Sequence, residues 1–230
     1  MKKTLIGATI NEIDAVKVVL PKIDKKVVDE VIIVDGGSTD GTVEFCEKNG
    51  IFVLHQKGKG YGAALKQALE IAKGDIIIEF TPDGSSLLED IPKLVAEMQK
   101  GYDFVIASRY KDGAKSYDDN IVTAFGNHMF TFLTNKLFGI SYTDTLVGYR
   151  AYRKDAITKL NADSDGLSWP LQTAIHFAKK GFKVSEIPSD EPKRIGGHRK
   201  MRIFGTGREI LFLIIREYIR MKRNKRYFQK

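Results

Sequence analysis

Two acidic side chains, Asp35 and Asp83, each follow a short apolar run and stand in a turn rich in Gly and Ser. The runs are Val31–Val34 and Ile76–Phe80, and both have the β-branched composition of buried strands. Parallel strands end at one edge of their sheet, where open α/β sheets bind ligands. Carboxylates there hold Mg²⁺ together with phosphate oxygens. The pattern therefore predicts a site for a charged small molecule, a nucleotide with its metal.

Both turns also have a simpler interpretation. Ser38 or Thr39 could cap a helix that begins near Thr42, and Pro82-Asp83-Gly84 is a common turn sequence. The cap does not account for an acid at the strand end followed by two glycines, which suit a close approach of a ligand to the backbone. The loop Gly58–Gly62 opens a further helix. Its amides either face an anion or form a tight turn.

The elements that must position these side chains follow from the apolar spacing. Short runs predict strands at Thr4–Ala8, Glu30–Val34, Ile51–Leu54, Ile76–Phe80 and Phe104–Ser108. Between them, helical spacing predicts helices at Ile13–Leu20, Val43–Asn49, Ala63–Ala72 and Leu88–Gln99. This alternation indicates βαβ units and a parallel sheet. The strand-end acids would then share one edge.

The regular alternation stops after Arg109, where Tyr110–Asn120 is polar and predicts a loop. Further elements are expected at the strand-like Thr143–Arg150, at Val184–Ile187, and in helices at Phe125–Phe138, Leu171–Lys180 and Arg208–Arg223. No linker is evident. We predict a single domain over residues 1–207, with 208–230 as a basic amphipathic C-terminal helix of the same chain.

The positive charge is concentrated at one end. Residues 191–230 carry 13 Lys or Arg against 3 Glu, whereas the other 190 residues carry 24 basic and 26 acidic side chains. Such an end suits an anionic surface or substrate. The single cysteine, Cys46, fits a reducing compartment. The first residues are too short in their apolar part for a signal peptide, and no run reaches the roughly 18 apolar residues of a membrane span. We therefore expect a cytoplasmic protein.

The tail allows two interpretations. Its apolar residues Leu211, Ile214, Ile215, Tyr218 and Met221 share one helical face. That face either packs on the core or on a partner subunit, or it anchors the protein to an anionic membrane surface, the inner face for a cytoplasmic protein.

Six short motifs follow one another along the chain. They are Asn11-Glu12, the segment Val34–Thr42, the turn around Asp83, Ala107–Tyr110, Thr143–Tyr152 and Arg194–Met201. Together they resemble the family 2 glycosyltransferases of GT-A fold, and most of all the polyprenyl-phosphate (dolichyl-phosphate) mannose and glucose synthases. The resemblance extends from Thr4 to about Gly207. The first acid of the family's Asp-x-Asp motif is replaced here by Thr81.

The resemblance implies an α/β fold, a GT-A Rossmann-like, mostly parallel sheet with flanking helices. It implies an enzyme that moves a hexose with inversion from a nucleotide diphosphate sugar to a polyprenyl phosphate, with Mg²⁺ or Mn²⁺ as cofactor. Some of the matched positions would bind the nucleotide sugar: Thr9, Asn11, Glu12, Asp35, Gly37, Ser38, Lys59, Thr81, Pro82, Asp83 and Arg109. Asp83 and Ser85 would bind the metal. The basic residues at the donor and acceptor phosphates would be Arg109, Arg150, Arg194 and Lys200.

Two other functions remain open on the residues alone. The same donor chemistry onto a soluble or glycan hydroxyl would need a general base. Asp144 is the candidate, although it could equally cap the turn before Thr145. An acceptor phosphate needs no base, but it needs cations. The other class is a basic nucleic-acid-binding module, suggested by a pI near 9.3. The nearly neutral body and the absence of a nucleic-acid-binding motif disfavour it.

Overall fold

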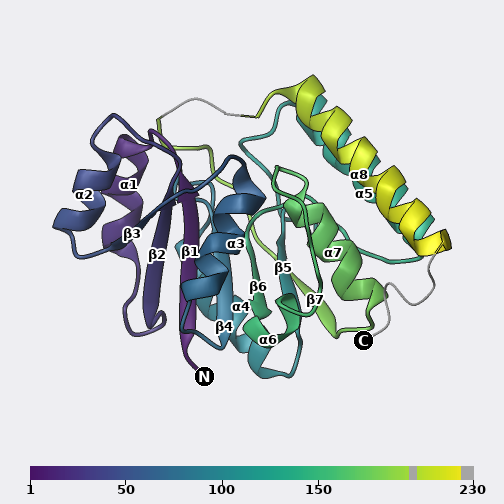
Figure 1. Cartoon of the computed structure of the whole chain (residues 1–230), viewed down its shortest axis with the longest axis horizontal. Helices are drawn as coiled ribbons and strands as arrows, with labels where there is room; N and C mark the ends of the chain where they lie inside the picture. The colour runs from purple at the N-terminus through teal and green to yellow at the C-terminus, as the bar shows by residue number, and fades with distance from the viewer. Residues whose placement is uncertain (197–200, 224–230) are drawn as a thin grey trace.

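The computed structural model describes residues 1–196 and 201–223. Its centre is a seven-stranded sheet in the order β3-β2-β1-β4-β6-β5-β7. The strands are β1 (Lys3–Thr9), β2 (Glu30–Asp35), β3 (Phe52–His55), β4 (Ile76–Phe80), β5 (Phe104–Ser108), β6 (Arg150–Arg153) and β7 (Val184–Pro188). Six strands are parallel and β6 runs against its two neighbours. The predicted α/β fold with a mostly parallel sheet is confirmed (Figure 1).

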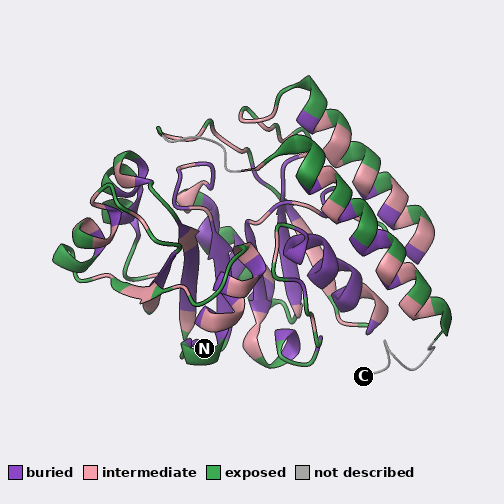
Figure 2. Ribbon diagram, turned by 45° about the horizontal axis from the view of Figure 1, so that its top comes forward, coloured by how far each residue is buried: buried purple, intermediate pink, exposed green. Residues whose placement is uncertain are grey.

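Helices alternate with the strands as the apolar spacing predicted. They are α1 (Ile13–Val19), α2 (Thr42–Lys48), α3 (Tyr61–Ile71), α4 (Ile91–Gln99), α5 (Ile121–Phe138), α6 (Lys154–Ile157), α7 (Trp169–Lys179) and α8 (Ile203–Arg223), with the 3₁₀ turns η1 (Leu20–Lys22) and η2 (Leu88–Asp90). Helices α3 and α7 cover one face of the sheet and α4 covers the other (Figure 1). The core lies between these layers and is formed mainly by buried aliphatic residues of the strands, such as Ile76–Ile78 in β4 (Figure 2).

The strand register brings the predicted acids to one edge. Thr9, the last residue of β1, lies beside Asp35, the last residue of β2. Gly7 of β1 lies beside Phe80, the last residue of β4, so the turn that carries Asp83 follows at the same edge. A Cβ atom on Gly7 would come within 2.6 Å of Pro82 Cγ. This glycine therefore lets the turn after β4 fold close over β1.

The reversed strand β6 is the main feature that the spacing did not predict. Its register places Arg150 beside Glu79 of β4, a cross-strand pair of opposite charge. Only the last residue of the expected strand-like piece Thr143–Arg150 belongs to β6. Four residues that include two arginines give a weak strand signal, and side-chain alternation does not report strand direction.

Helices α5 and α8 lie side by side beyond the end of the sheet where β7 runs (Figure 1). A second apolar cluster holds them to α7, with Phe138, Leu171, Ile175, Ile210, Leu213 and Ile214 at its centre. The face predicted for the tail is thereby divided. Ile214, Tyr218 and Met221 pack inward, whereas Leu211 and Ile215 are exposed. In residues 1–196 and 201–223, no helix is long and apolar enough to cross a bilayer.

Candidate functional site

Asp35 organises the loop after β2. Its carboxylate accepts hydrogen bonds from the backbone N–H of Gly37 (2.8 Å) and of Ser38 (3.0 Å) and from the Ser38 hydroxyl. Ser38 in turn accepts from the Asn11 N–H at 2.8 Å, and the Thr39 N–H donates to Asn11 Oδ1. Asn11 has a positive φ of 52°, a conformation that Asn tolerates better than most residues. These four predicted residues, Asp35, Gly37, Ser38 and Asn11, thus fix two loops to each other.

A cavity of about 560 Å³ opens at the carboxyl ends of the strands. Seven residues predicted from the sequence to bind line it: Thr9, Glu12, Lys59, Thr81, Pro82, Asp83 and Arg194. Gly36 also lines it. The backbone there carries no side chain, which leaves room for the close approach of a ligand that the sequence predicts. The hydroxyl of Thr9 is buried and has no hydrogen-bond partner within the described ranges. We call this space the donor cavity, after the nucleotide-sugar donor that the sequence resemblance predicts for its lining residues.

The turn after β4 holds Asp83 in place. Asp83 Oδ1 accepts from the backbone N–H of Ser85 at 3.0 Å and from its hydroxyl at 2.7 Å. Gly84 has a φ of 88°, a left-handed conformation that favours glycine. The Ile195 N–H donates to the Asp83 carbonyl at 2.7 Å, which draws the segment with Arg194 over the turn. Asp83 Oδ2 faces Arg194 Nη1 at 3.5 Å.

Arg194 joins two acids. Besides facing Asp83, its Nη2 lies 2.9 Å from Asp118 Oδ2, and its Nε lies 3.3 Å from Asp118 Oδ1. A smaller cavity of about 160 Å³ lies on the other side of this group, and Thr81, Asp83 and Arg194 line both cavities. This second cavity is lined further by Ser85 and Arg109. The three shared side chains therefore form a wall with one carboxylate and one guanidinium between two spaces.

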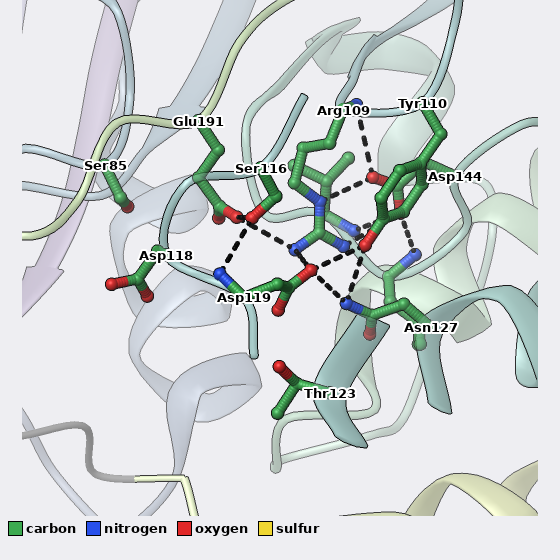
Figure 3. Close-up of polar contacts among 12 residues, drawn as sticks. Ser85, Arg109, Tyr110, Ser116, Asp118, Asp119, Thr123, Asn127, Asp144 and Glu191 are labelled. Atoms are coloured by element: carbon green, nitrogen blue, oxygen red, sulfur yellow. Dashed lines mark hydrogen bonds and ion pairs between the residues drawn. The ribbon is translucent and has the colours of Figure 1, made fainter. Parts of the chain in front are cut away.

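Arg109 does not reach the donor cavity. Its guanidinium makes a bidentate contact with Asp144, with Nε–Oδ2 at 2.6 Å and Nη2–Oδ1 at 3.1 Å. Nη1 lies 3.3 Å from Glu191 Oε2 and 3.8 Å from Asp119 Oδ2. Figure 3 shows the guanidinium enclosed by these carboxylates, with Tyr110 and Asn127 beside it. Burial raises the pKa of Glu191, while the Arg109 charge acts in the opposite direction. Arg109 lines the second cavity, with its charge balanced by acids, and its role at a substrate phosphate stays a prediction.

Asp144 acts as a cap in this structure. The side chain is fully buried, and its Oδ1 accepts from the backbone N–H groups of Leu146 (3.1 Å) and Val147 (3.2 Å) as well as from Arg109. A general base must be able to take a proton from the acceptor. Both oxygens contact Arg109 and Oδ1 also caps two backbone N–H groups, so the contacts fit the capping alternative.

Arg150, which the sequence predicts at a phosphate, lies away from both cavities, and that role stays a prediction. Its side chain is completely buried under the sheet edge, where Nη1 donates to the Pro170 carbonyl at 2.8 Å and Nη2 to the Val147 carbonyl. Its Nε lies 3.8 Å from Glu79 Oε2. Burial lowers the pKa of Arg150, against the opposing effect of Glu79. The guanidinium therefore lies beside the Glu79 carboxylate and has no exposed surface in this structure.

Lys200 lies outside the described residues. Several residues that line the donor cavity were not predicted, among them Gln56, Tyr61, Leu167 and Met201. Tyr61 belongs to the segment Gly58–Gly62, which was suggested as a ligand loop, and Gln56 lies two residues before that segment. This suggestion was the only sequence signal for either residue. Leu167 precedes α7 and Asp118 lies in a polar loop, and nothing in their local sequence distinguishes them.

The oxygen atoms at and beside Asp83 suit a divalent cation that is also bound by a ligand. No group of three or more His, Cys, Asp or Glu side chains in the described part of the chain is arranged to hold a metal. One carboxylate with phosphate oxygens and water is nevertheless a usual set for Mg²⁺. Ser85 and Thr81, whose hydroxyls lie 3.0 Å apart, add neutral oxygen atoms beside Asp83. The residues present therefore fit Mg²⁺ or Mn²⁺ held together with a diphosphate.

Comparison with known proteins places this geometry in context. The family model described as glycosyl transferase family 2 matches residues 7–160. The chain is 30% identical to "Glycosyltransferase AglJ" of Haloferax volcanii over 80% of its own length and 61% of the relative's. It is 31% identical to the "Dolichyl-phosphate hexose transferase" of the same organism, over 90% and 89% of the two chains.

A solved structure shares the fold. It is the glucosyl-3-phosphoglycerate synthase of Mycobacterium tuberculosis in complex with Mn²⁺, uridine-diphosphate-glucose and phosphoglyceric acid. The TM-score is 0.75, with 20% identity, over 94% of this chain and 79% of the other. At that identity the likeness concerns the fold alone. It supports the GT-A fold that the motif resemblance implied.

Proposed function

Since this chain belongs to glycosyl transferase family 2, we propose that it transfers a hexose, with inversion, from a nucleoside diphosphate sugar to a polyprenyl phosphate. The observation that carries the proposal is the wall of Thr81, Asp83 and Arg194 between two cavities. A transferase must bring two substrates together at one point. Here the donor cavity and the second cavity meet at a carboxylate and a guanidinium.

In this proposal the donor cavity holds the nucleoside and directs the diphosphate toward Asp83. Thr9 supplies an unused buried hydroxyl, and Gly36 allows contact with the backbone. Asp83, with Ser85 and Thr81 beside it, would hold Mg²⁺ or Mn²⁺ together with the diphosphate. When bound, the cation supplies positive charge to the leaving diphosphate. Arg194 supplies a second cation at the same wall, where charge develops as the glycosidic bond breaks.

The contacts of Asp144 favour a phosphate acceptor over a hydroxyl. A hydroxyl acceptor needs a base, and Asp144 is occupied by Arg109 and two backbone N–H groups. A phosphate monoester is already anionic at neutral pH and attacks without losing a proton. Arg194 would reduce its repulsion from the donor diphosphate. The relative of nearly equal length is named for transfer to dolichyl phosphate, a lipid of this class.

A lipid acceptor requires the protein to meet a membrane. The outer sides of α5 and α8 expose large apolar side chains, listed together as Ile121, Val122, Phe125, Met129, Phe132, Phe204, Leu211, Phe212, Ile215 and Ile219. Exposed cations accompany them on α8, at Arg208, Lys222 and Arg223. Apolar side chains beside cations suit an anionic leaflet. We propose that this apolar surface of α5 and α8 rests on the membrane.

A thermal-shift panel tests the donor class. Wild-type protein is heated with UDP-, GDP-, CMP- and dTDP-sugars, each with and without Mn²⁺. A ligand that binds the folded state raises the melting temperature by mass action. The sugar nucleotide with the correct nucleobase should therefore give a clear rise in melting temperature that depends on Mn²⁺. No rise with any sugar nucleotide would contradict the proposed function. Transfer of labelled hexose from that donor to a polyprenyl phosphate, against a soluble glycan hydroxyl, then separates the two acceptor classes.

A further inference from the structure

The hydroxyl of Tyr61 has no assigned role. Tyr61 is the first residue of α3 and lines the donor cavity. Its oxygen is buried and has no hydrogen-bond partner in the described part of the chain. A buried hydroxyl without a partner loses its hydrogen bonds to water and gains none in return. Phenylalanine would fill the same space without that penalty, so packing alone does not account for the oxygen.

Close backbone contacts fix the position of Tyr61. Gly60 precedes it with a φ of 106°, and a Cβ atom on Gly60 would lie 2.2 Å from the Asp165 carbonyl oxygen. The loop is therefore pressed onto the segment before α7. On its other side the Tyr61 oxygen lies 2.9 Å from the position that a Cβ atom on Gly148 would occupy. The missing side chain at Gly148 leaves the room that the hydroxyl uses.

This position lies where the two cavities meet. Tyr61 lines the donor cavity and Gly148 lines the second cavity, and Asp83 lines both. The Tyr61 oxygen lies against Gly148, 2.9 Å from the position of a Cβ atom there, so its side chain reaches from the lining of the donor cavity to that of the second cavity. Burial raises the pKa of Tyr61, so the group stays a neutral hydroxyl that can both donate and accept.

We propose that the Tyr61 hydroxyl hydrogen-bonds the transferred hexose and so helps to select the sugar of the donor. The proposal rests on the proposed function, because it assigns one contact within the donor site. The hexose is the part of the donor that must lie at the junction of the cavities. Its hydroxyl groups offer the partner that the protein does not supply.

The test compares Tyr61→Phe with wild type in the absence of any acceptor. Affinities are measured by calorimetry with Mn²⁺ for two pairs of probes, UDP-glucose against UDP and GDP-mannose against GDP. For the pair that wild type binds, the variant should lose about tenfold in affinity for the sugar nucleotide, the usual value of one hydrogen bond. Affinity for the bare nucleotide should stay within about twofold. The melting temperature of the ligand-free variant should stay equal or rise.

Thr134→Val is the matched control. The Thr134 hydroxyl, in α5, is also buried without a partner among the described residues, and it lines neither cavity. This variant should leave both affinities unchanged. Equal affinity of Tyr61→Phe and wild type for the sugar nucleotide overturns the proposal, as does an equal loss for sugar nucleotide and bare nucleotide. Binding of neither nucleotide by wild type overturns the proposed function, and the proposal with it.

Discussion

At the scale of single residues, the site depends on side chains whose charges are balanced in different ways. Arg109 and Arg150 are enclosed by acids and carbonyls, so they maintain the structure around the site. Asp83 and Arg194 face each other at 3.5 Å, longer than a hydrogen bond, and both line the cavities. A pair held loosely in this way can rearrange around a ligand at lower cost than an enclosed one.

The first prediction concerns Asp83. Asp83→Asn removes the charge and little volume, so the fold should persist while Mn²⁺-dependent binding of the donor sugar nucleotide is lost. Calorimetry with and without Mn²⁺ measures this, with the melting temperature as the check on folding. Asp118→Asn is the matched control, because Asp118 contacts Arg194 but lines neither cavity. Unchanged Mn²⁺-dependent affinity in Asp83→Asn would remove the metal assignment.

The second prediction concerns Arg194. Arg194→Ala should lower kcat for transfer to a polyprenyl phosphate by about 10²-fold, the usual loss when one group that stabilises developing charge is removed. Donor affinity should change by less than about threefold, because such contacts are made mainly in the transition state. Arg153→Ala is the control, since Arg153 lies at the opposite edge of the sheet. A loss confined to donor affinity would assign Arg194 to donor binding instead.

Sequence reasoning predicted the location of residues that lie next to a strand end, but not the contacts of residues whose partners are distant in sequence. Asp83 and Thr9 were expected at this edge because the end of a parallel strand has a known location, and both line the cavity there. The burial of Arg150 was not expected, because it depends on Pro170 and Val147, which pack around it only in the folded chain. The pairing of Arg194 with Asp118, 76 residues apart, has no local signal at all.

At the scale of elements, buried polar contacts fix α8 to α7. Glu217 of α8 is fully buried, and it lies 3.0 Å from His176 Nε2 and 3.0 Å from Gln172 Nε2. Arg220 approaches the same carboxylate at 3.0 Å. The tail helix was predicted from periodicity, but its apolar residues face both inward and outward, so the sequence could not tell which side packs. These polar contacts identify the inner side.

The third prediction follows from that carboxylate. Glu217→Gln should lower the free energy of unfolding at pH 7 by about 1–3 kcal/mol, because the partners of a buried acceptor are left poorly satisfied. Burial raises the pKa of Glu217, but the His176 hydrogen bond and further contacts outweigh burial and lower it overall. A lowered pKa stabilises the fold above the unfolded pKa, near 4.3, and that contribution is lost as the pH falls through the folded value.

The difference between Glu217→Gln and wild type should therefore be full at pH 7 and shrink below about pH 4. Urea denaturation at pH 7 and at acidic pH measures it. Glu47→Gln is the control, because Glu47 of α2 is exposed and should change stability by less than about 0.5 kcal/mol. A difference that stayed constant with pH would mean that the Glu217 charge is not what holds the helix.

At the scale of the whole molecule, the apolar surface of α5 and α8 lies at the opposite end of the sheet from β3 (Figure 1). Ile121, at the start of α5, is 90% exposed, and Phe204, at the start of α8, is 92% exposed. The inner side of α8 belongs to an apolar cluster. Removing the helix would therefore uncover that cluster, and point changes on the outer side are the better probe of membrane contact.

The fourth prediction uses those two positions. The double variant Ile121→Ser, Phe204→Ser should pellet less with anionic vesicles than wild type, because two apolar side chains no longer enter the leaflet. Raising the salt concentration should release wild type only in part, since the cations contribute but the apolar contact remains. Phe52→Ser is the control, because Phe52 of β3 is 55% exposed at the far end. Equal pelleting of all three proteins, or none by wild type, would make this surface a contact between proteins.

The reversed strand has a consequence for how the chain assembles. Both sheet neighbours of β5, the strands β6 and β7, come after it in sequence, so during synthesis β5 has no strand to join until Arg150 has been made. β3, β2, β1 and β4 are contiguous and can pair before then. When β6 forms, it joins β5 to the group of β3, β2, β1 and β4. The same step places Arg150 beside Glu79. Folding during synthesis should therefore be sequential, and in pulsed hydrogen exchange of ribosome-bound nascent chains the β5 amides should gain protection no earlier than those of β6 and later than those of β1.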